Sequence, residues 1–194
     1  MTEREKAAAG LLYDANYDEE LIREREACKD LCFRLNSCLP SDTRSQKEIL
    51  KKLIPGIPDS AVVTAPFWCD YGRNITVGEG FYTNHNCIIL DGAKVTFGDY
   101  VFIAPNCCFS TAGHPLDAEQ RNEGLEIALP ITVGNNVWIG ANVTVLPGVT
   151  IGDNTVIGAG STVTRDIPSG VVAVGSPCRP VREITEADAH KYRR

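Results

Sequence analysis

An aliphatic residue recurs at every sixth position through the C-terminal half of the chain, and this period restricts the possible folds more than any other feature. Six consecutive hexads carry Val or Ile at the first position, and four of them carry Gly at the second. The fifth position holds Val, Thr, Ser or Ile. The hexads begin at Val133, Ile139, Val145, Ile151, Ile157 and Val163. Self-similarity at a fixed period is the signature of a repeat architecture.

A period of six is typical of a short strand that ends in a corner, after which the chain turns into the next strand. The aliphatic residue then points inward at each turn, and the neighbouring Gly allows a tight backbone at the corner. Successive coils stack at about 4.8 Å and bury one continuous aliphatic column. The repeat therefore predicts a mainly β protein, a parallel β-helix, but the period alone fixes neither its hand nor its cross-section.

The same frame continues towards the N-terminus, at Ala65, Tyr71, Val77, Thr83 and Ile89. A two-residue insertion near Asp91 resets the frame, which resumes at Phe97 and Ile103. It breaks again over residues 110–130, a polar segment longer than a corner needs. Long loops on a rigid scaffold commonly carry function, so this inserted loop is a candidate part of a site.

The N-terminal segment has a helical pattern instead. Apolar residues spaced by three and four between Tyr17 and Leu39 predict one helix, and Asp42 offers an N-cap for a second helix that ends at Leu53. Pro55 and Pro58 close it. The expected organisation is a helical segment over residues 1–58, a β-helix over 59–182 with an inserted loop at 110–130, and a C-terminal tail over 183–194.

The composition excludes several classes of protein. The net charge of −6 argues against a general nucleic-acid binder, and the hydrophobic fraction of 43% is ordinary for a globular protein. No apolar run approaches the roughly 18 residues of a membrane helix, and the first residues lead into no apolar stretch of a secretory signal. We therefore expect a cytoplasmic protein that binds neither nucleic acid nor membrane.

The eight cysteines are scattered and form no CxxC pair. This spacing predicts no zinc finger, and a chain without an export signal is not expected to carry a disulfide framework. We expect most of them to be small buried hydrophobic residues, with Cys28 and Cys32 sharing a helix face, and we expect no metal site.

Three histidines are the candidates for proton transfer near neutral pH. His114 stands at the root of the inserted loop, where a rigid coil edge can hold its ring beside a cleft; the alternative is a loop histidine without a task. His85 lies within a hexad and favours a polar or structural role. His190 lies in the Arg-rich tail and is expected to be exposed.

Six short segments, taken together, carry a more specific pattern than the hexads. They are residues 9–14 (AGLLYD), 81–86 (FYTNHN), 103–106 (IAPN), 110–115 (STAGHP), 137–141 (VWIGA) and 175–179 (GSPCR). As a set they resemble the maltose and galactoside O-acetyltransferases, a family of hexapeptide-repeat acyltransferases, from about residue 3 to the end. The resemblance implies a left-handed triangular prism, a hand that is an exception to the right-handed crossover rule. It also implies a homotrimer with each active site between two prisms.

The resemblance implies an enzyme that moves an acetyl group from acetyl-coenzyme A to a sugar hydroxyl by direct transfer, with no metal. His114 matches the family's general base, and Glu126 is a candidate to hold its ring, with an exposed loop carboxylate as the alternative. The positions that match acceptor-binding residues are Asp14, Tyr82, Asn84 and Asp91. Asp91 is also explained as a turn residue and Asp14 as a helix cap.

The positions that match coenzyme A-binding residues are Trp138, Gly140, Ala141, Ala159, Thr164, Arg165, Arg179 and Arg182. Small residues at the coil edges suit the thin, amide-bearing pantetheine arm, and the Ala141 N–H can stabilise the thioester oxyanion. Some relatives have Ser at this position, so a hydroxyl contribution is absent here. The three arginines can pair with the phosphates, although each is also explained as part of a solvated basic patch.

Three other interpretations stay open at this stage. A metalloenzyme on the same prism, such as a gamma carbonic anhydrase, needs three histidines converging on zinc, and the histidine spacing here does not match. A non-catalytic trimeric scaffold does not explain the inserted loop at His114 or the Arg-bearing C-terminal segment. Relatives that acetylate serine or antibiotics share the prism, but the paired N-terminal helices favour a sugar, with maltose or glucose preferred and galactosides as the alternative.

Overall fold

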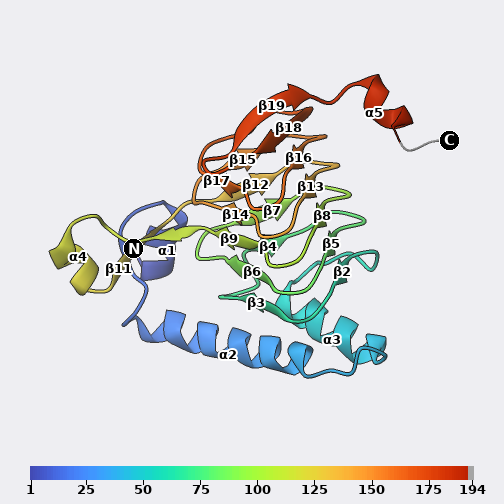
Figure 1. The fold of residues 1–194 in the computed structure, drawn as a ribbon. Helices are drawn as coiled ribbons and strands as arrows, with labels where there is room; N and C mark the ends of the chain where they lie inside the picture. The colour runs from blue at the N-terminus through green and yellow to red at the C-terminus, as the bar shows by residue number, and fades with distance from the viewer. Residues whose placement is uncertain (192–194) are drawn as a thin grey trace.

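The computed structural model describes residues 1–191 and shows a prism of stacked β-coils whose three sides are three sheets (Figure 1). The first sheet has the order β19 (Arg179–Glu183), β18 (Val171–Val174), β16 (Val156–Ile157), β13 (Trp138–Ile139), β8 (Phe102–Ile103), β5 (Tyr82–Thr83) and β2 (Val62–Val63). The second comprises β17 (Thr162–Val163), β14 (Thr144–Val145), β9 (Cys108–Ser110), β6 (Cys87–Leu90) and β3 (Phe67–Cys69). The third comprises β15 (Thr150–Ile151), β12 (Ile131–Val133), β7 (Val95–Phe97) and β4 (Ile75–Thr76).

The strand register shows why the sequence period is six. Trp138 pairs in parallel with Val156, eighteen residues later, so one coil consumes three hexads and returns to the same side of the prism. In the earlier coils the offset is twenty residues, as between Tyr82 and Phe102. The observed fold is therefore the hexapeptide-repeat β-helix that the sequence predicts. Hexapeptide repeats of this kind fit a left-handed β-helix, as the family resemblance implies.

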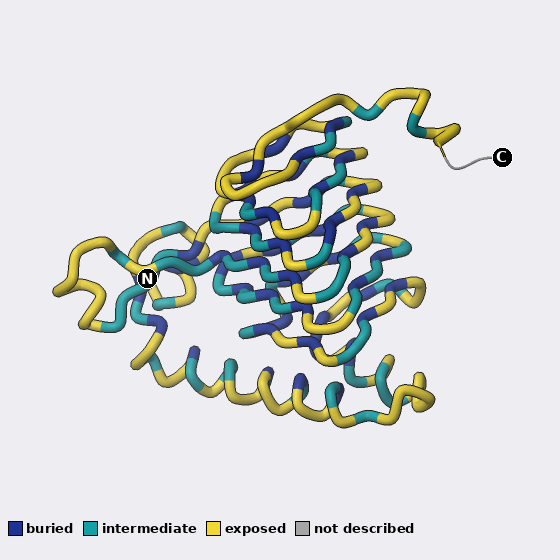
Figure 2. Tube along the Cα trace, in the orientation of Figure 1, coloured by how far each residue is buried: buried dark blue, intermediate teal, exposed yellow. Residues whose placement is uncertain are grey.

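The first position of every hexad points into the prism. All six aliphatic residues from Val133 to Val163 are at most 1% exposed. Aromatic rings fill three of the coils: the Phe97 ring lies 5.1 Å from Phe81 in a tilted contact and 5.0 Å from Phe109 in an edge-to-face contact, measured between ring centroids. Figure 2 shows the buried residues repeating along the inner side of each coil. The core is thus one continuous column, as the phasing predicts.

The predicted frame is wrong in the first coil. Ala65 and Tyr71 do not point into the column, and Val63 and Cys69, which are 5% and 4% exposed, take the inward positions instead. The frame shifts because the chain adds two residues between Cys69 and Val77, as it does again between Ile89 and Phe97. Both extensions lie where the five-stranded sheet turns into the four-stranded sheet.

The fourth hexad position carries a signal that the aliphatic pattern does not include. Asn86, Asn106, Asn142 and Gly160 stack at equivalent corners, and all four have positive φ, at 59°, 62°, 58° and 72°. Asn and Gly are the residues that adopt this left-handed backbone at least cost. The Asn86 amide also donates to the Asn106 side chain at 2.9 Å, so the corners are linked from coil to coil.

Helices close one end of the prism. The helix α2 (Glu19–Asn36) begins at Asp18, whose carboxylate accepts from the Leu21 N–H at 2.9 Å, and it packs against β3. It is two to three residues shorter at each end than the predicted span. The helix α3 (Thr43–Leu53) has Asp42 as its N-cap, as predicted. A shorter helix, α1 (Glu3–Ala8), precedes them.

The segment inserted after β9 is not an irregular loop. It contains β10 (Ala112–Gly113), α4 (Ala118–Asn122) and β11 (Leu125–Ala128), and β11 pairs with both β10 and β1 (Tyr13–Asp14). After β18 the chain reverses into β19 and ends in α5 (Glu186–His190), where His190 is exposed as expected. Residues 192–194 of the expected tail lie outside the described residues. None of the helices in residues 1–191 combines the length and the apolar character needed to span a bilayer.

Two edges of the prism carry the candidate residues. We call the corner between the seven- and five-stranded sheets the Gly140 edge; it includes residues 84–86, 104–106, 140–142 and 158–160. We call the corner between the five- and four-stranded sheets the His114 edge; it includes residues 70–74, 91–94, the insertion 110–130, and residues 146–149 and 164–166. Figure 1 shows the insertion with α4 and β11 on one side of the prism and β13 and β16 on the other.

Candidate active site

His114 directly follows β10 and lies at the end of a small three-stranded antiparallel sheet. Ala112 pairs with Ala128 and Gly113 with Ile127, so the register brings His114 opposite Glu126. Glu126 in turn pairs with Tyr13 of β1. The N-terminal segment and the insertion, more than a hundred residues apart in sequence, therefore form one surface at the His114 edge.

The backbone of β11 fixes the imidazole of His114. Its Nδ1 lies 3.2 Å from the carbonyl oxygen of Leu125. A carbonyl can only accept, so in the neutral ring Nδ1 carries the proton and Nε2 has the free lone pair. The side chain is 52% exposed, which leaves Nε2 open to a substrate.

Glu126 lies on the opposite side of the ring from the one expected for an orienting residue. Its Oε1 is 3.9 Å from Nε2 of His114, beyond hydrogen-bond distance, whereas Leu125 contacts Nδ1. The Tyr13 hydroxyl donates to Glu126 Oε2 at 3.3 Å, and burial together with this carboxylate raises the pKa of Tyr13. Glu126 therefore faces the same open space as the basic nitrogen.

A polar cavity of about 190 Å³ lies beside Glu126. Its other walls come from β1, from α2, and from the two-residue extensions of the coils; the lining residues that the sequence analysis missed are Tyr13, Asn16, Arg25, Lys29, Asp70, Tyr71, Gly92 and Ala112. Burial raises the pKa of Asp70. Tyr13 and Ala112 lie in segments that carry the family resemblance, but no sequence pattern brings the eight residues together, because they come from five distant segments that meet only in the fold.

Asp14 is close to this site, but its carboxylate forms hydrogen bonds with its own neighbours in the chain. It pairs across the strands with Leu125, whose carbonyl holds His114. Its Oδ1 accepts from the N–H groups of Asn16 and Tyr17, at 3.1 and 2.9 Å, so the carboxylate also shapes the turn before α2. The side chain remains partly exposed.

The expectation that Asp91 contacts an acceptor is not supported by its position. Its side chain is fully buried, and its two oxygens accept from the N–H groups of Asp70, Tyr71 and Asn74 at 3.0, 2.8 and 3.3 Å. Burial raises its pKa to about 6. Asp91 acts on the cavity indirectly, because it holds the loop that carries Asp70 and Tyr71.

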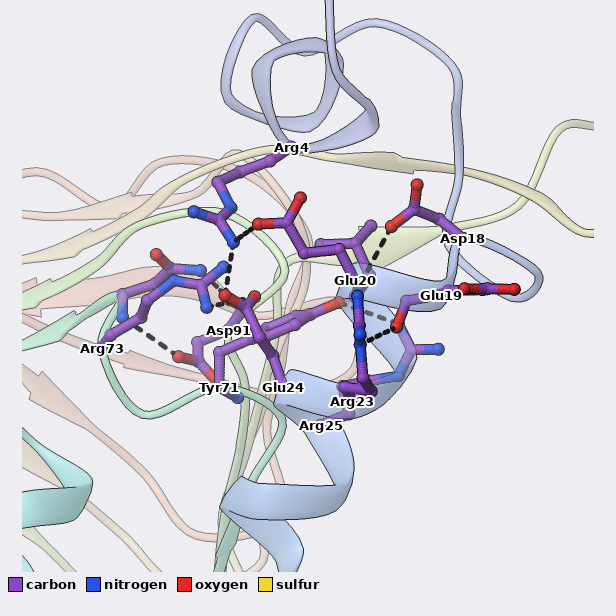
Figure 3. Close-up of polar contacts among 12 residues, drawn as sticks. Arg4, Asp18, Glu19, Glu20, Arg23, Glu24, Arg25, Tyr71, Arg73 and Asp91 are labelled. Carbon is purple, nitrogen blue, oxygen red and sulfur yellow. Dashed lines mark hydrogen bonds and ion pairs between the residues drawn. The ribbon is translucent and has the colours of Figure 1, made fainter.

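A charged network fastens the N-terminal segment to this side of the prism. Figure 3 shows Arg4 of α1 directed at Glu20 and Glu24 of α2, and Arg73 of the first extension also pairs with Glu24. Arg25 donates to the Tyr71 hydroxyl at 2.8 Å. These contacts hold α1 against α2 and join α2 to the 70–74 loop, and α2 and that loop both line the polar cavity.

The second group of candidates lies on or beside the seven-stranded sheet. Tyr82 and Trp138 point outward from the same ladder, on either side of Phe102, and Trp138 is 56% exposed. A cavity of about 260 Å³ is formed by Trp138, Val156, Val172, Arg182, Ile184, Asp188 and Lys191. Asn84 follows β5 and begins the Gly140 edge. An elongated ligand can lie along this ladder.

Gly140 and Ala159 show why small residues occupy this edge. A Cβ on Gly140 would come within 2.6 Å of the Ala159 backbone nitrogen on the next coil. The Ala141 carbonyl accepts from Gly160 N–H at 2.8 Å, whereas the Ala141 N–H has no acceptor within residues 1–191. That N–H is available to a carbonyl oxygen of a ligand.

The expected phosphate-binding residues are exposed but differ in their surroundings. Arg182 forms a bidentate pair with Asp188 at 2.8 Å for each contact, so it must exchange this partner to bind a phosphate. Arg179 donates to the Cys178 carbonyl at 2.6 Å. Thr164 and Arg165 are exposed on the His114 edge, apart from Trp138.

One chain therefore does not bring all the candidates together. His114, Glu126 and Asp14 lie at the His114 edge, while Tyr82, Asn84, Trp138, Gly140, Ala141 and Ala159 lie at or beside the Gly140 edge, across the five-stranded sheet. A site that uses both groups needs the two edges of different chains to meet.

Comparisons with known proteins agree with this arrangement of helices and coils. Residues 6–58 match the maltose acetyltransferase hexapeptide capping motif, and residues 130–165 match the bacterial transferase hexapeptide, six repeats. A maltose O-acetyltransferase from Clostridium difficile 630 is 49% identical, with 96% of this chain and 99% of that chain covered and a TM-score of 0.93.

Two further solved structures were determined with the cofactor. A galactoside acetyltransferase in complex with coenzyme A is 43% identical, with 100% of this chain and 96% of that chain covered and a TM-score of 0.92. The hexapeptide-repeat acetyltransferase VCA0836 from Vibrio cholerae O1 biovar eltor, complexed with acetyl coenzyme A, is 34% identical, with 96% and 100% covered and a TM-score of 0.88. With this fold, these two sequence matches and this degree of identity, the chain is an acyltransferase and belongs to the maltose and galactoside acetyltransferase family of hexapeptide-repeat enzymes.

Proposed function

We propose that the protein transfers the acetyl group of acetyl-coenzyme A directly to a hydroxyl of a small sugar, of the maltose or glucose type, with His114 as the general base. The observation that carries the proposal is the contact between His114 Nδ1 and the Leu125 carbonyl, which in the neutral ring leaves the lone pair on Nε2, on a side chain that is exposed. A positioned base of this kind contributes roughly 10²–10⁴-fold to the rate.

The proposed reaction needs no acetyl-enzyme. The sugar oxygen attacks the thioester carbonyl carbon while Nε2 takes its proton, and the oxyanion that forms is held by the Ala141 N–H of an adjacent chain. The C–S bond then breaks, and the imidazolium returns the proton to the departing thiolate. The products are the acetylated sugar and free coenzyme A. Glu126, on the Nε2 side, stabilises the imidazolium and contacts the acceptor.

The polar cavity beside Glu126 is the proposed acceptor site. Its carboxylates, amide and phenol groups suit an acceptor with several hydroxyls, because each can hold one or two of them. Asp14, Asp70 and Asn16 contribute on the His114 edge, and Tyr82 and Asn84 complete the site from a neighbouring chain. The cofactor lies along the Gly140 edge, past Trp138 and towards Arg179 and Arg182 of the same chain, and Thr164 and Arg165 reach it from the His114 edge of the neighbouring chain. A homotrimer supplies both edges three times.

The acceptor class is tested by incubating the protein with acetyl-coenzyme A and a panel of maltose, glucose, galactosides, serine and aminoglycosides. Free thiol release gives the rate, and mass spectrometry identifies the product. We expect acetylated sugar. Turnover on serine or an aminoglycoside with none on any sugar would contradict the acceptor assignment, and preference for a galactoside would revise it to the alternative.

The role of His114 is tested by the His114→Ala variant. We expect kcat to fall by roughly 10²–10⁴-fold with binding of acetyl-coenzyme A nearly unchanged, because only proton transfer is removed. His190→Ala, which removes an exposed histidine from α5, is the matched control and should retain full turnover. Turnover of the His114→Ala enzyme within a few fold of the parent would exclude the general-base role.

A further inference from the structure

Three cysteines converge where α2 packs on the first coil. Cys28 and Cys32 are one helical turn apart on α2, and Cys69 ends β3. The Cys69 Sγ lies 3.5 Å from that of Cys28 and 3.8 Å from that of Cys32. All three sulfur atoms lie within 4.8 Å of one another. Sequence spacing could not show this cluster, because Cys69 is distant from the other two in the chain.

The cluster is buried and lies on a helix and a paired strand. The three residues are 4%, 0% and 4% exposed, and all are free thiols. They belong to the main hydrophobic core, next to Leu35 and Phe67 of the same interface. Two ligands on a capped helix and a third on a paired strand hold their positions without a bound ion, which lowers the cost of binding one.

We infer that Cys28, Cys32 and Cys69 bind one soft metal ion, of the Cu(I) class, through three sulfur ligands. Thiolates select soft ions such as Cu(I) and Zn²⁺. Structural zinc sites almost always have four ligands, and no His, Cys, Asp or Glu among residues 1–191 adds a fourth donor to the group. Burial also excludes water as a fourth ligand. These observations favour an ion that is satisfied by three sulfurs.

Ion binding exchanges protons for metal. Each thiol that becomes a ligand has to lose its proton, because the thiolate is the form that binds metal. Binding breaks S–H bonds, forms metal–sulfur bonds and releases the protons to solvent, without any change of oxidation state. The acetyl transfer proposed above is not involved.

Because of where the cluster lies, a bound ion would change how two elements are held together. It would join α2 to β3, an interface that is otherwise held by packing and by two hydrogen bonds between Asn36 and Phe67. The same helix carries Arg25 and Lys29, which line the polar cavity beside Glu126. A bound ion therefore pins the wall of that cavity to the prism.

The test is an anaerobic titration of the reduced protein with Cu(I) in competition with a chromophoric Cu(I) chelator. We expect about one equivalent per chain to be withheld from the chelator. Cys69→Ala should lower the Cu(I) affinity by roughly 100-fold or more, since losing a direct ligand costs at least as much as losing an outer contact. Cys87→Ala, which removes another buried thiol on the neighbouring strand β6, should leave it unchanged.

Two outcomes would overturn the inference. One is a Cu(I) affinity that is the same in the parent protein and in folded Cys69→Ala; the other is X-ray absorption of the loaded parent protein that shows fewer than three sulfur neighbours. The second measurement needs no variant, so it applies even if the substitutions unfold the protein. A parallel titration with Zn²⁺ should give weaker retention, and tighter binding of Zn²⁺ than of Cu(I) would contradict the three-coordinate assignment.

Discussion

Asp91 shows at the level of a single residue how a buried charge can support a site that it does not enter. Its carboxylate holds three backbone N–H groups of the 70–74 loop, and Asp70 and Tyr71 of that loop line the proposed acceptor cavity. Replacing it therefore disturbs the cavity through the loop rather than through a lost contact with substrate.

The burial of Asp91 predicts a pH dependence of stability. Its pKa of about 6 in the folded protein lies above the value of about 3.9 in an unfolded chain, so the folded state holds the proton more tightly. The free energy of unfolding should gain about 1 kcal/mol from this group as the pH falls from 7 to 5. Urea unfolding of the parent and of Asp91→Asn at both pH values, at one protein concentration, measures the difference. Equal pH dependence in the two proteins would contradict the prediction.

The sequence predicted the role of a residue where its position in the hexad decides that role. It did not predict the role of a residue that depends on contact with a distant segment. Val133 and Ile139 are buried because position in the hexad alone decides their direction. The backbone partners of Asp91 could not be predicted, because they lie about twenty residues earlier in the chain. Likewise, Leu125 holds His114 through its backbone, which no side-chain pattern can reveal.

At the level of elements, the stacking of coils decides which residues can occupy the Gly140 edge. A Cβ at Gly140 would lie 2.6 Å from the Ala159 nitrogen, and backbone cannot move aside as a flexible side chain can. The closeness of these two corners also keeps the proposed cofactor path free of side chains.

Gly140→Ala should therefore force adjacent coils apart. We expect a loss of about 1–3 kcal/mol in the free energy of unfolding, the usual range for overpacking, and weaker binding of acetyl-coenzyme A. The control is Gly113→Ala, where the new Cβ would meet only Ile127 at 3.8 Å, and its stability should stay within about 0.5 kcal/mol of the parent. Thermal unfolding and cofactor titration check both; similar losses in the two variants would show that coil spacing is not the cause.

The elements that the sequence predicted least well are those of the His114 edge. The hexads predict the strands of the prism because each repeat carries its own signal. The pairing of β1 with β11 joins residues 13 and 126. These strands have two and four residues, so both are too short to show a period in the sequence. The insertion was therefore expected only as a long polar loop.

At the level of the whole molecule, the separation of the two groups of candidates predicts shared sites. His114 and Asn84 lie on different edges of one prism, so a site between chains takes one from each.

Two inactive variants should then restore each other. His114→Ala and Asn84→Ala, co-expressed in equal amounts, should regain activity, because about a quarter of the interfaces combine an intact His114 edge with an intact Gly140 edge. Each variant expressed alone is one control. The second control is the protein that carries both substitutions in every chain, and it should stay inactive. Activity of the mixture no higher than the mean of the two separate variants would place both residues in one chain's site.

The two ends of the prism differ from its middle, because each terminal coil is partly covered by other segments of the chain. A stack of parallel coils presents unpaired N–H and C=O groups at each terminal rung, and another copy could dock there and extend the stack into a fibre. At one end the Asn36 amide takes both hydrogen bonds of Phe67. At the other, β19 runs antiparallel to β18 and carries Pro180, which has no N–H to offer. Asn36 and Pro180, at opposite ends of the same solenoid, thus each reduce the number of free backbone groups to which a second copy could pair.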